Sequence, residues 1–187
     1  MNNSDHIYSN LDLKKLLIPI IVEQLLSCLM GTVDTMMVSN VGSAAISAVS
    51  LVDSINVLVI QALSALAAGG AILCSQYLGS HNEKSANHAA RQVLLVMAVL
   101  STALSLLCLL FRVPLLHFIF GKVEADVMAN SQSYFLFTLL SFPFIGLYDA
   151  GASIMRAQND SRRPMIISVI SNFLNIGGNA ILIFGLN

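Results

Sequence analysis

The chain has 187 residues, of which 56% are hydrophobic and only 10% are charged, whereas a soluble domain carries about 25% charged residues. A water-soluble fold of this length has too little interior to bury so much apolar surface, so the composition indicates a membrane protein. The formal net charge of -1 gives no electrostatic signal for a nucleic-acid partner. The three cysteines lie in apolar segments without CxxC spacing, which predicts small core residues rather than a disulfide framework or a metal site: Cys28, Cys74 and Cys108.

The apolar residues are grouped into segments that are each long enough to cross a bilayer, which takes about 20 residues per helix. The sequence therefore predicts an all-α membrane protein with about five transmembrane helices. A polar N-terminal arm occupies residues 1–13, and a transmembrane helical lobe occupies residues 14–187. The expected spans are residues 16–38, 45–78, 93–111, 134–155 and 164–186.

The segments between the spans differ in character. Residues 39–44 carry no charge and predict a tight hairpin, and the polar residues 79–91 are expected to close the next hairpin on the other side of the membrane. The mixed stretch around residues 112–132 predicts an interfacial amphipathic helix.

Two kinds of helix-modifying residue occur within the spans. Pro19 and Pro164 are expected in first turns, where the missing N–H costs little. Pro143 is expected inside a span, so a neighbouring helix must satisfy the carbonyl that it frees. Small residues, among them Gly70, Gly177 and Gly178, predict close helix packing.

The basic residues are distributed unequally between the two sides of this topology. Of the nine Lys and Arg residues, only Arg112 and Lys122 fall on one side, which leaves seven on the other. Because cytoplasmic loops are enriched in Lys and Arg, the richer side is expected to be the cytoplasm. The N-terminus is therefore expected to be cytoplasmic.

Several acidic residues fall within the predicted spans: Glu23, Asp34, Asp53 and Asp149. A charged acid at mid-bilayer costs about 2.5 to 3.5 kcal/mol on insertion scales, so each is a candidate functional residue. Asp53 and Asp149 lie nearer to helix ends, where reaching the interface is an equally good explanation. Glu23 and Asp53 are possible accessory acids.

Asp34 has two candidate partners at a similar depth. It lies roughly 27 Å above the cytoplasmic start of its helix, and Asn175 and Asn179 stack four residues apart on one face of the last span. A carboxylate and two amide oxygens suit Na⁺, and the carboxylate equally suits a proton. The alternative is that the two asparagines only hold helices together by hydrogen bonds, and the spacing alone favours that explanation.

The motifs of several enzyme classes are missing, so no enzymatic activity and no cofactor are expected. The sequence contains neither GxxxxGK[ST] nor HExxH, the motifs of nucleotide-binding loops and zinc proteases. The GLYDAG segment around Asp149 is similar to one half of an intramembrane aspartyl protease. The second catalytic carboxylate motif of that protease class does not occur.

Four segments, in order, resemble multidrug and toxic compound extrusion (MATE) transporters. They are LKKLLIPIIVEQLLSCLMGTVDTMMVSNVGSAAISAVSLVDS, ALAAGGAILCSQYLG, RAQNDSRRPM and NFLNIGGNAILIFG. The resemblance covers residues 11–187 and implies most of the N-terminal six-helix lobe of such a transporter. Asn159 replaces a glycine of the family's loop motif, and asparagine tolerates the left-handed conformation.

The resemblance implies export of small organic cations or drugs across a plasma membrane, in exchange for H⁺ or Na⁺. The family's cation-site positions fall on Asp34, Asn175 and Asn179. Because some members carry an aspartate at the last position, Asn179 leaves the choice of coupling ion open. A C-terminal lobe is missing from the chain, which is therefore expected to be a fragment. Alternatives are a non-transporting membrane scaffold, a truncated inactive fragment, and a flippase for lipid-linked oligosaccharides from the same superfamily.

Overall fold

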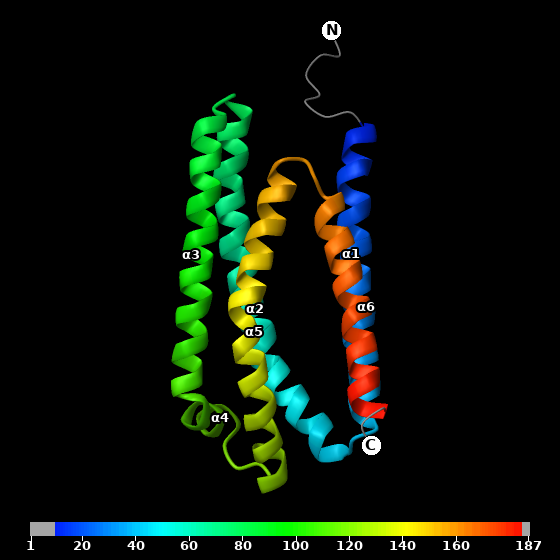
Figure 1. Ribbon diagram of the computed structural model, residues 1–187. Coiled ribbons are helices and arrows are strands. Elements are labelled where there is room, and N and C mark those ends of the chain that lie inside the picture. Colours follow the sequence, from blue (N-terminus) through cyan, green and yellow to red (C-terminus); the bar gives the residue numbers. More distant parts are fainter. Residues whose placement is uncertain (1–9, 185–187) are drawn as a thin grey trace. The chain divides into compact units, whose positions relative to one another are not determined.

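A computed structural model describes residues 10–184 of the chain, and the side chains of residues 13–181. It consists of helices α1 (Asn10–Ser39), α2 (Ser43–Gly79), α3 (Glu83–Leu110), α4 (Arg112–Phe120), α5 (Ala125–Ala157) and α6 (Arg162–Phe184) (Figure 1). No strand occurs within these residues. The chain divides into two compact units: unit 1 contains α1, the last turn of α5 and α6, and unit 2 contains α2 to α4 and the rest of α5.

Five of the helices are long and apolar enough to cross a membrane, which confirms the predicted fold class. The segments are Leu13–Ser39, Ser43–Gly79, Glu83–Leu110, Ala125–Ala157 and Arg162–Ile181. Residues 1–9 of the predicted polar arm lie outside the described residues, as do residues 185–187. Residues 10–13 of that arm are already helical, because α1 begins at Asn10.

Unit 2 packs α2, α3 and α5 around an apolar core. The buried positions of α2 recur every three or four residues, which places them on one face of the helix: Ala48, Val52, Asn56, Val59, Leu63, Ala67, Ala71 and Cys74. Helix α5 shows the same spacing, and its largest fully buried side chains are Phe135 and Phe142. Leu116 of the short helix α4 joins this core.

Two glycines allow the helices of unit 2 to approach closely. A Cβ at Gly70 would lie 2.5 Å from Val93 Cγ2, and a Cβ at Gly146 would lie 2.7 Å from Ser101 Cβ. The prediction of close packing is therefore confirmed at Gly70. It is wrong at Gly177 and Gly178, where an added Cβ would meet nothing within 4 Å.

A neighbouring helix satisfies the carbonyl that Pro143 frees. Pro143 lacks an N–H, so the Leu139 carbonyl four residues earlier has no partner within α5. The hydroxyl of Ser105 on α3 donates to this carbonyl at 2.5 Å in a buried position. The predicted compensation is confirmed, and helix α5 continues through the proline to Ala157.

Replacing Ser105 by alanine should therefore destabilise the chain in a manner that depends on Pro143. We expect a loss of about 1 to 2 kcal/mol in the free energy of unfolding, because a buried carbonyl loses its donor. Pro143→Ala restores a backbone donor to Leu139, so Ser105→Ala should cost less in that background. Unfolding of the purified full chain in detergent measures all four variants. Equal costs in the two backgrounds would contradict this account.

Two helices begin well before the predicted apolar spans. Helix α3 begins at Glu83, ten residues before the predicted span, and α5 begins at Ala125, nine residues before its span. The hairpin expected within residues 79–91 turns at residues 80–82, and most of that polar segment is helical. The side chain of Asn82 accepts the Ser85 N–H at 3.1 Å and caps the polar first turn of α3.

Other local predictions have mixed outcomes. Pro164 lies in the first turn of α6 as predicted, whereas Pro19 lies well inside α1 because that helix begins at Asn10. A helix is present at residues 112–120, and its interfacial position remains a prediction. Of the predicted core cysteines, Cys74 is buried and Cys108 is half-buried, but Cys28 is exposed.

Candidate functional site

Asp34 and the two asparagines predicted to accompany it are neighbours in unit 1. The amide nitrogen of Asn179 donates to Asp34 Oδ1 at 2.8 Å and to Asn175 Oδ1 at 2.9 Å. The first bond joins α1 to α6, and the second lies along α6, where a separation of four residues places side chains on one face. Asp34 and Asn179 are half-buried, and Asn175 is exposed. The structure therefore brings together all three residues named from the sequence.

The three side chains of this trio are arranged around the amide nitrogen of Asn179. Two acceptor oxygens, one from a carboxylate and one from an amide, converge on a single donor group. Rotation of the Asn179 amide by half a turn would replace its nitrogen with a third oxygen. Oxygen atoms of these kinds are the ligands that hard cations prefer. No group of three His, Cys, Asp or Glu residues suited to a metal occurs in the described part of the chain.

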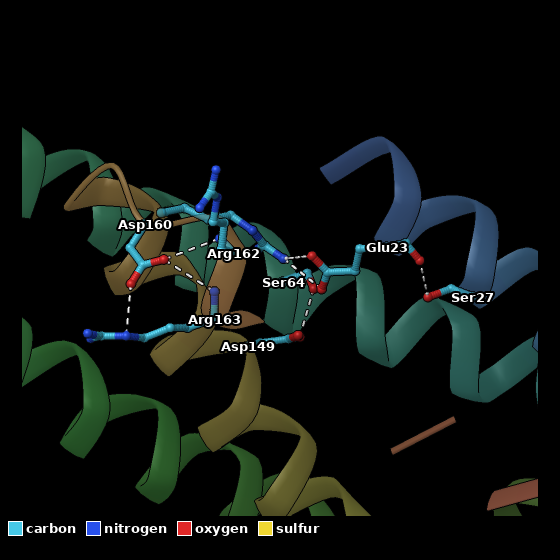
Figure 2. A network of polar contacts seen from close by, with 8 residues as sticks. Glu23, Ser27, Ser64, Asp149, Asp160, Arg162 and Arg163 are labelled. Atoms are coloured by element: carbon cyan, nitrogen blue, oxygen red, sulfur yellow. Dashed lines mark hydrogen bonds and ion pairs between the residues drawn. The ribbon is translucent and has the colours of Figure 1, made fainter. Parts of the chain in front are cut away.

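Glu23, the accessory acid without a predicted partner, forms an ion pair within unit 1. Both of its carboxylate oxygens accept from Arg156 Nη2, at 2.9 and 2.8 Å. The Glu23 side chain is 12% exposed and that of Arg156 is 32% exposed. In Figure 2, Ser27 lies beside Glu23, and its hydroxyl donates to the Glu23 backbone carbonyl. Glu23 thus reaches a basic residue that lies between the predicted spans 134–155 and 164–186.

Asp53, the second accessory acid, lies in a polar cluster inside unit 2. Its Oδ1 accepts from Tyr134 Oη at 3.1 Å and from Asn56 Nδ2 at 3.2 Å. The cluster therefore joins α2 to α5. Asn56 is 7% exposed, and its Oδ1 has no hydrogen-bond partner among the described residues. These bonds explain how a carboxylate is accommodated within a spanning helix.

Asp149 also has a partner on another helix of unit 2. The hydroxyl of Ser64 on α2 donates to Asp149 Oδ2 at 2.7 Å (Figure 2). Asp149 is half-buried, so a side chain from α2 rather than the membrane interface supplies this bond. The contact fits a role in helix association, as polar side chains often have in membrane bundles.

The turn between α5 and α6 is built by two residues. Asn159 has a φ of 64°, which confirms the left-handed conformation predicted for it. Asp160 Oδ1 accepts the N–H groups of Arg162 and Arg163, both at 3.2 Å, and so caps the start of α6 (Figure 2).

Comparison with known proteins assigns the chain to a family. A family model described as MatE matches residues 19–181, which is most of the chain. The chain belongs to the MatE family. It is therefore a multi-pass membrane protein, and the family is one of transporters.

Two curated relatives illustrate the similarity. The "Uncharacterized transporter YisQ" of Bacillus subtilis (strain 168) is 31% identical over 169 residues, which are 90% of this chain and 36% of the relative. The "Probable multidrug resistance protein NorM" of Thermotoga maritima is 26% identical over 174 residues, which are 93% of this chain and 37% of the relative. The chain thus spans little more than a third of the length of these relatives.

Solved structures agree with the family assignment at the level of the fold. A MOP superfamily transporter from Pyrococcus furiosus Vc1 superimposes with a TM-score of 0.87 at 22% identity, over 94% of this chain and 38% of that chain. A MATE structure in complex with MaL6 gives a TM-score of 0.88 at 22% identity, over 94% and 39%. The fold of this MatE chain corresponds to the N-terminal lobe of such transporters.

Proposed function

We propose that this MatE chain forms the cation-binding lobe of an antiporter that exports small organic cations in exchange for Na⁺ or H⁺. The observation that carries the proposal is the contact of Asp34 with Asn179, and of Asn179 with Asn175, within predicted spanning segments. A carboxylate in such a segment is costly to insert into the membrane, which makes it a candidate functional residue. Relatives named as probable multidrug resistance proteins support the direction of transport and the type of cargo.

Binding of the ion would rearrange this trio. A cation at Asp34 Oδ1 and Asn175 Oδ1 takes the place of the Asn179 amide nitrogen, which then turns its oxygen toward the ion. A proton on Asp34 has a related effect, because it removes the charge that attracts the Asn179 N–H. Either event changes the bond between α1 and α6. An ion drives a conformational change only to the extent that it binds the two states with different affinities.

The proposal includes a plasma-membrane location, a cytoplasmic N-terminus and a second lobe that completes the substrate cavity. The chain covers 36% of the length of the YisQ relative and 37% of that of the Thermotoga maritima NorM relative, which leaves room in those proteins for such a lobe. Related transporters place their binding sites at the interface of repeated halves. The second lobe is thus the expected partner of this chain.

Transport in membrane vesicles tests the proposal. Everted vesicles are prepared from cells that express the gene encoding this chain, so that export corresponds to ethidium uptake from the medium, and a Na⁺ gradient or a pH gradient is imposed separately. We expect one of these gradients to drive ethidium movement above that of vesicles from cells without the gene. With the second lobe also present in the vesicles, ethidium movement that responds to neither gradient would overturn the antiport proposal in favour of a scaffold.

The same vesicles test cargo of opposite charge. A relative from Shewanella oneidensis, 25% identical over 153 residues, is named an FAD transporter. FAD is therefore included as an anionic cargo beside ethidium. Transport of FAD without ethidium would overturn the organic-cation assignment while leaving the ion coupling intact.

A further inference from the structure

The hairpin of α2 and α3 in unit 2 carries a basic cavity at its turn. The cavity has a volume of about 610 Å³. It is lined by the last turn of α2 and the first three turns of α3: Tyr77, Lys84, Ser85, Asn87, His88, Ala89, Arg91 and Gln92. None of these residues belongs to the Asp34 trio or to the other intramembrane acids.

The lining of this cavity is positive. Lys84, His88 and Arg91 lie at positions i, i+4 and i+7 of α3, so they share one face of the helix. No carboxylate lines the cavity, although Glu83 precedes it at the start of α3. Gln92 Nε2 lies 3.2 Å from the His88 ring nitrogen Nε2 and adds a polar group to the lining. Arg and Lys side chains in such a group suit a phosphate.

An apolar groove continues from the cavity along the same two helices. It has a volume of about 240 Å³ and shares Ala89 and Gln92 with the basic cavity. Its remaining lining is apolar: Leu66, Gly70, Leu73, Val93, Val96, Met97 and Leu100. Leu73 and Val96 are 53% and 56% exposed, so the groove opens outward from the hairpin.

The length of the groove fits one leaflet of a bilayer. From Gln92 to Leu100 the helix rises about 12 Å, at 1.5 Å per residue. Half of the hydrocarbon core is about 15 Å thick. A molecule that fills both spaces therefore needs an anionic head and an apolar tail of leaflet length.

We propose that the α2–α3 hairpin binds an anionic phospholipid. The phosphate lies against Lys84 and Arg91, and one acyl chain lies in the groove past Val96. The distribution of basic residues places this turn on the cytoplasmic side, where the leaflet carries anionic lipids. This inference depends on membrane insertion of the hairpin and not on transport by the Asp34 trio.

Lipid retention by the full chain tests the site. The chain is purified in detergent, equilibrated with equal amounts of phosphatidylglycerol and phosphatidylcholine, and examined by native mass spectrometry. We expect phosphatidylglycerol to be retained preferentially. The double variant Lys84→Gln/Arg91→Gln should lower that preference roughly tenfold, because each basic side chain contributes to the attraction. The variant Arg112→Gln/Lys122→Gln removes the same charge outside the cavity and should leave the preference unchanged.

The groove is tested separately from the charges. Val96→Trp should fill the groove and lower phosphatidylglycerol retention. Val99→Trp, at an apolar position that is 61% exposed but outside the groove lining, should not. Equal retention of the two lipids, or equal effects of a variant and its control, would overturn the proposal. Glycerol 3-phosphate should not compete at millimolar concentration, and full competition would indicate a site for soluble phosphates instead.

Discussion

Replacing Asp34 by asparagine is expected to remove the response of the chain to the coupling ion proposed for it. The substitution keeps the size of the side chain and its ability to bond Asn179, but it removes the negative charge. Charge-assisted bonds are worth about 1.5 to 3 kcal/mol, so we expect the affinity for the cation to fall about 10- to 100-fold. In vesicles, gradient-driven movement of ethidium should be abolished at unchanged expression.

Thermal unfolding isolates the ion effect from transport. A ligand that binds the native state raises its stability by an amount that grows with ligand concentration. If Na⁺ is the coupling ion, the wild-type chain should melt at a higher temperature in NaCl than in equimolar KCl, and Asp34→Asn should abolish the difference. If H⁺ is the coupling ion, neither chain distinguishes Na⁺ from K⁺, and only the vesicle assay responds to the variant.

A matched control comes from another acid of a spanning helix. Asp149 is half-buried and accepts a hydrogen bond from Ser64, as Asp34 accepts one from Asn179. Asp149→Asn should leave both the ion response and the gradient-driven movement in place. Unchanged ethidium movement in Asp34→Asn, or its equal loss in Asp149→Asn, would contradict the role given to Asp34.

The trio of Asp34, Asn175 and Asn179 could be predicted from the sequence because depth in a helical membrane protein follows position along the chain. Each helical residue adds about 1.5 Å of rise, so counting from the loops gives comparable heights for polar groups on different helices. The same arithmetic identified five spans. It does not determine which faces meet, and the spacing alone favoured a merely structural role for the asparagines.

The partners of the other acids could not be found in this way. Arg156 is 133 residues from Glu23 in sequence. The predicted span ended at residue 155, whereas α5 continues to Ala157 and places Arg156 on a helix. Tyr134 and Ser64 carry no charge, so nothing marked them as partners of Asp53 and Asp149. The one available signal was a basic residue on the same side of the membrane as Glu23, but seven basic residues share that side, so it does not single out Arg156.

Helix ends were missed for a related physical reason. Apolar runs report where the chain meets lipid, whereas the hydrogen-bonded helix continues into water wherever its residues favour it. The start of α3 illustrates this, because Asn82 caps a polar first turn that lies outside the apolar run. The predicted spans therefore follow the apolar runs and miss the polar first turns of α3 and α5.

The ion pair of Glu23 with Arg156 should be the most costly polar contact of unit 1 to break. Removing one partner of a fully buried pair costs about 3 to 5 kcal/mol. Because Arg156 is 32% exposed, water screens part of that cost, and we expect about 2 to 3 kcal/mol for Glu23→Gln. Chemical unfolding of the full chain in detergent measures the change.

A second ion pair supplies the comparison that makes this prediction specific. Arg163 Nε lies 3.0 Å from Asp160 Oδ2, but its side chain is 76% exposed, so Arg163→Gln should cost less than about 1 kcal/mol. Arg156→Gln leaves the Glu23 carboxylate, which is only 12% exposed, without its guanidinium partner. Its cost in the free energy of unfolding should be several times that of Arg163→Gln. The double variant Glu23→Gln/Arg156→Gln should be more stable than either single variant, since it removes both charges together. Additive costs in the double variant would mean that the two side chains stabilise the chain separately and not as a pair.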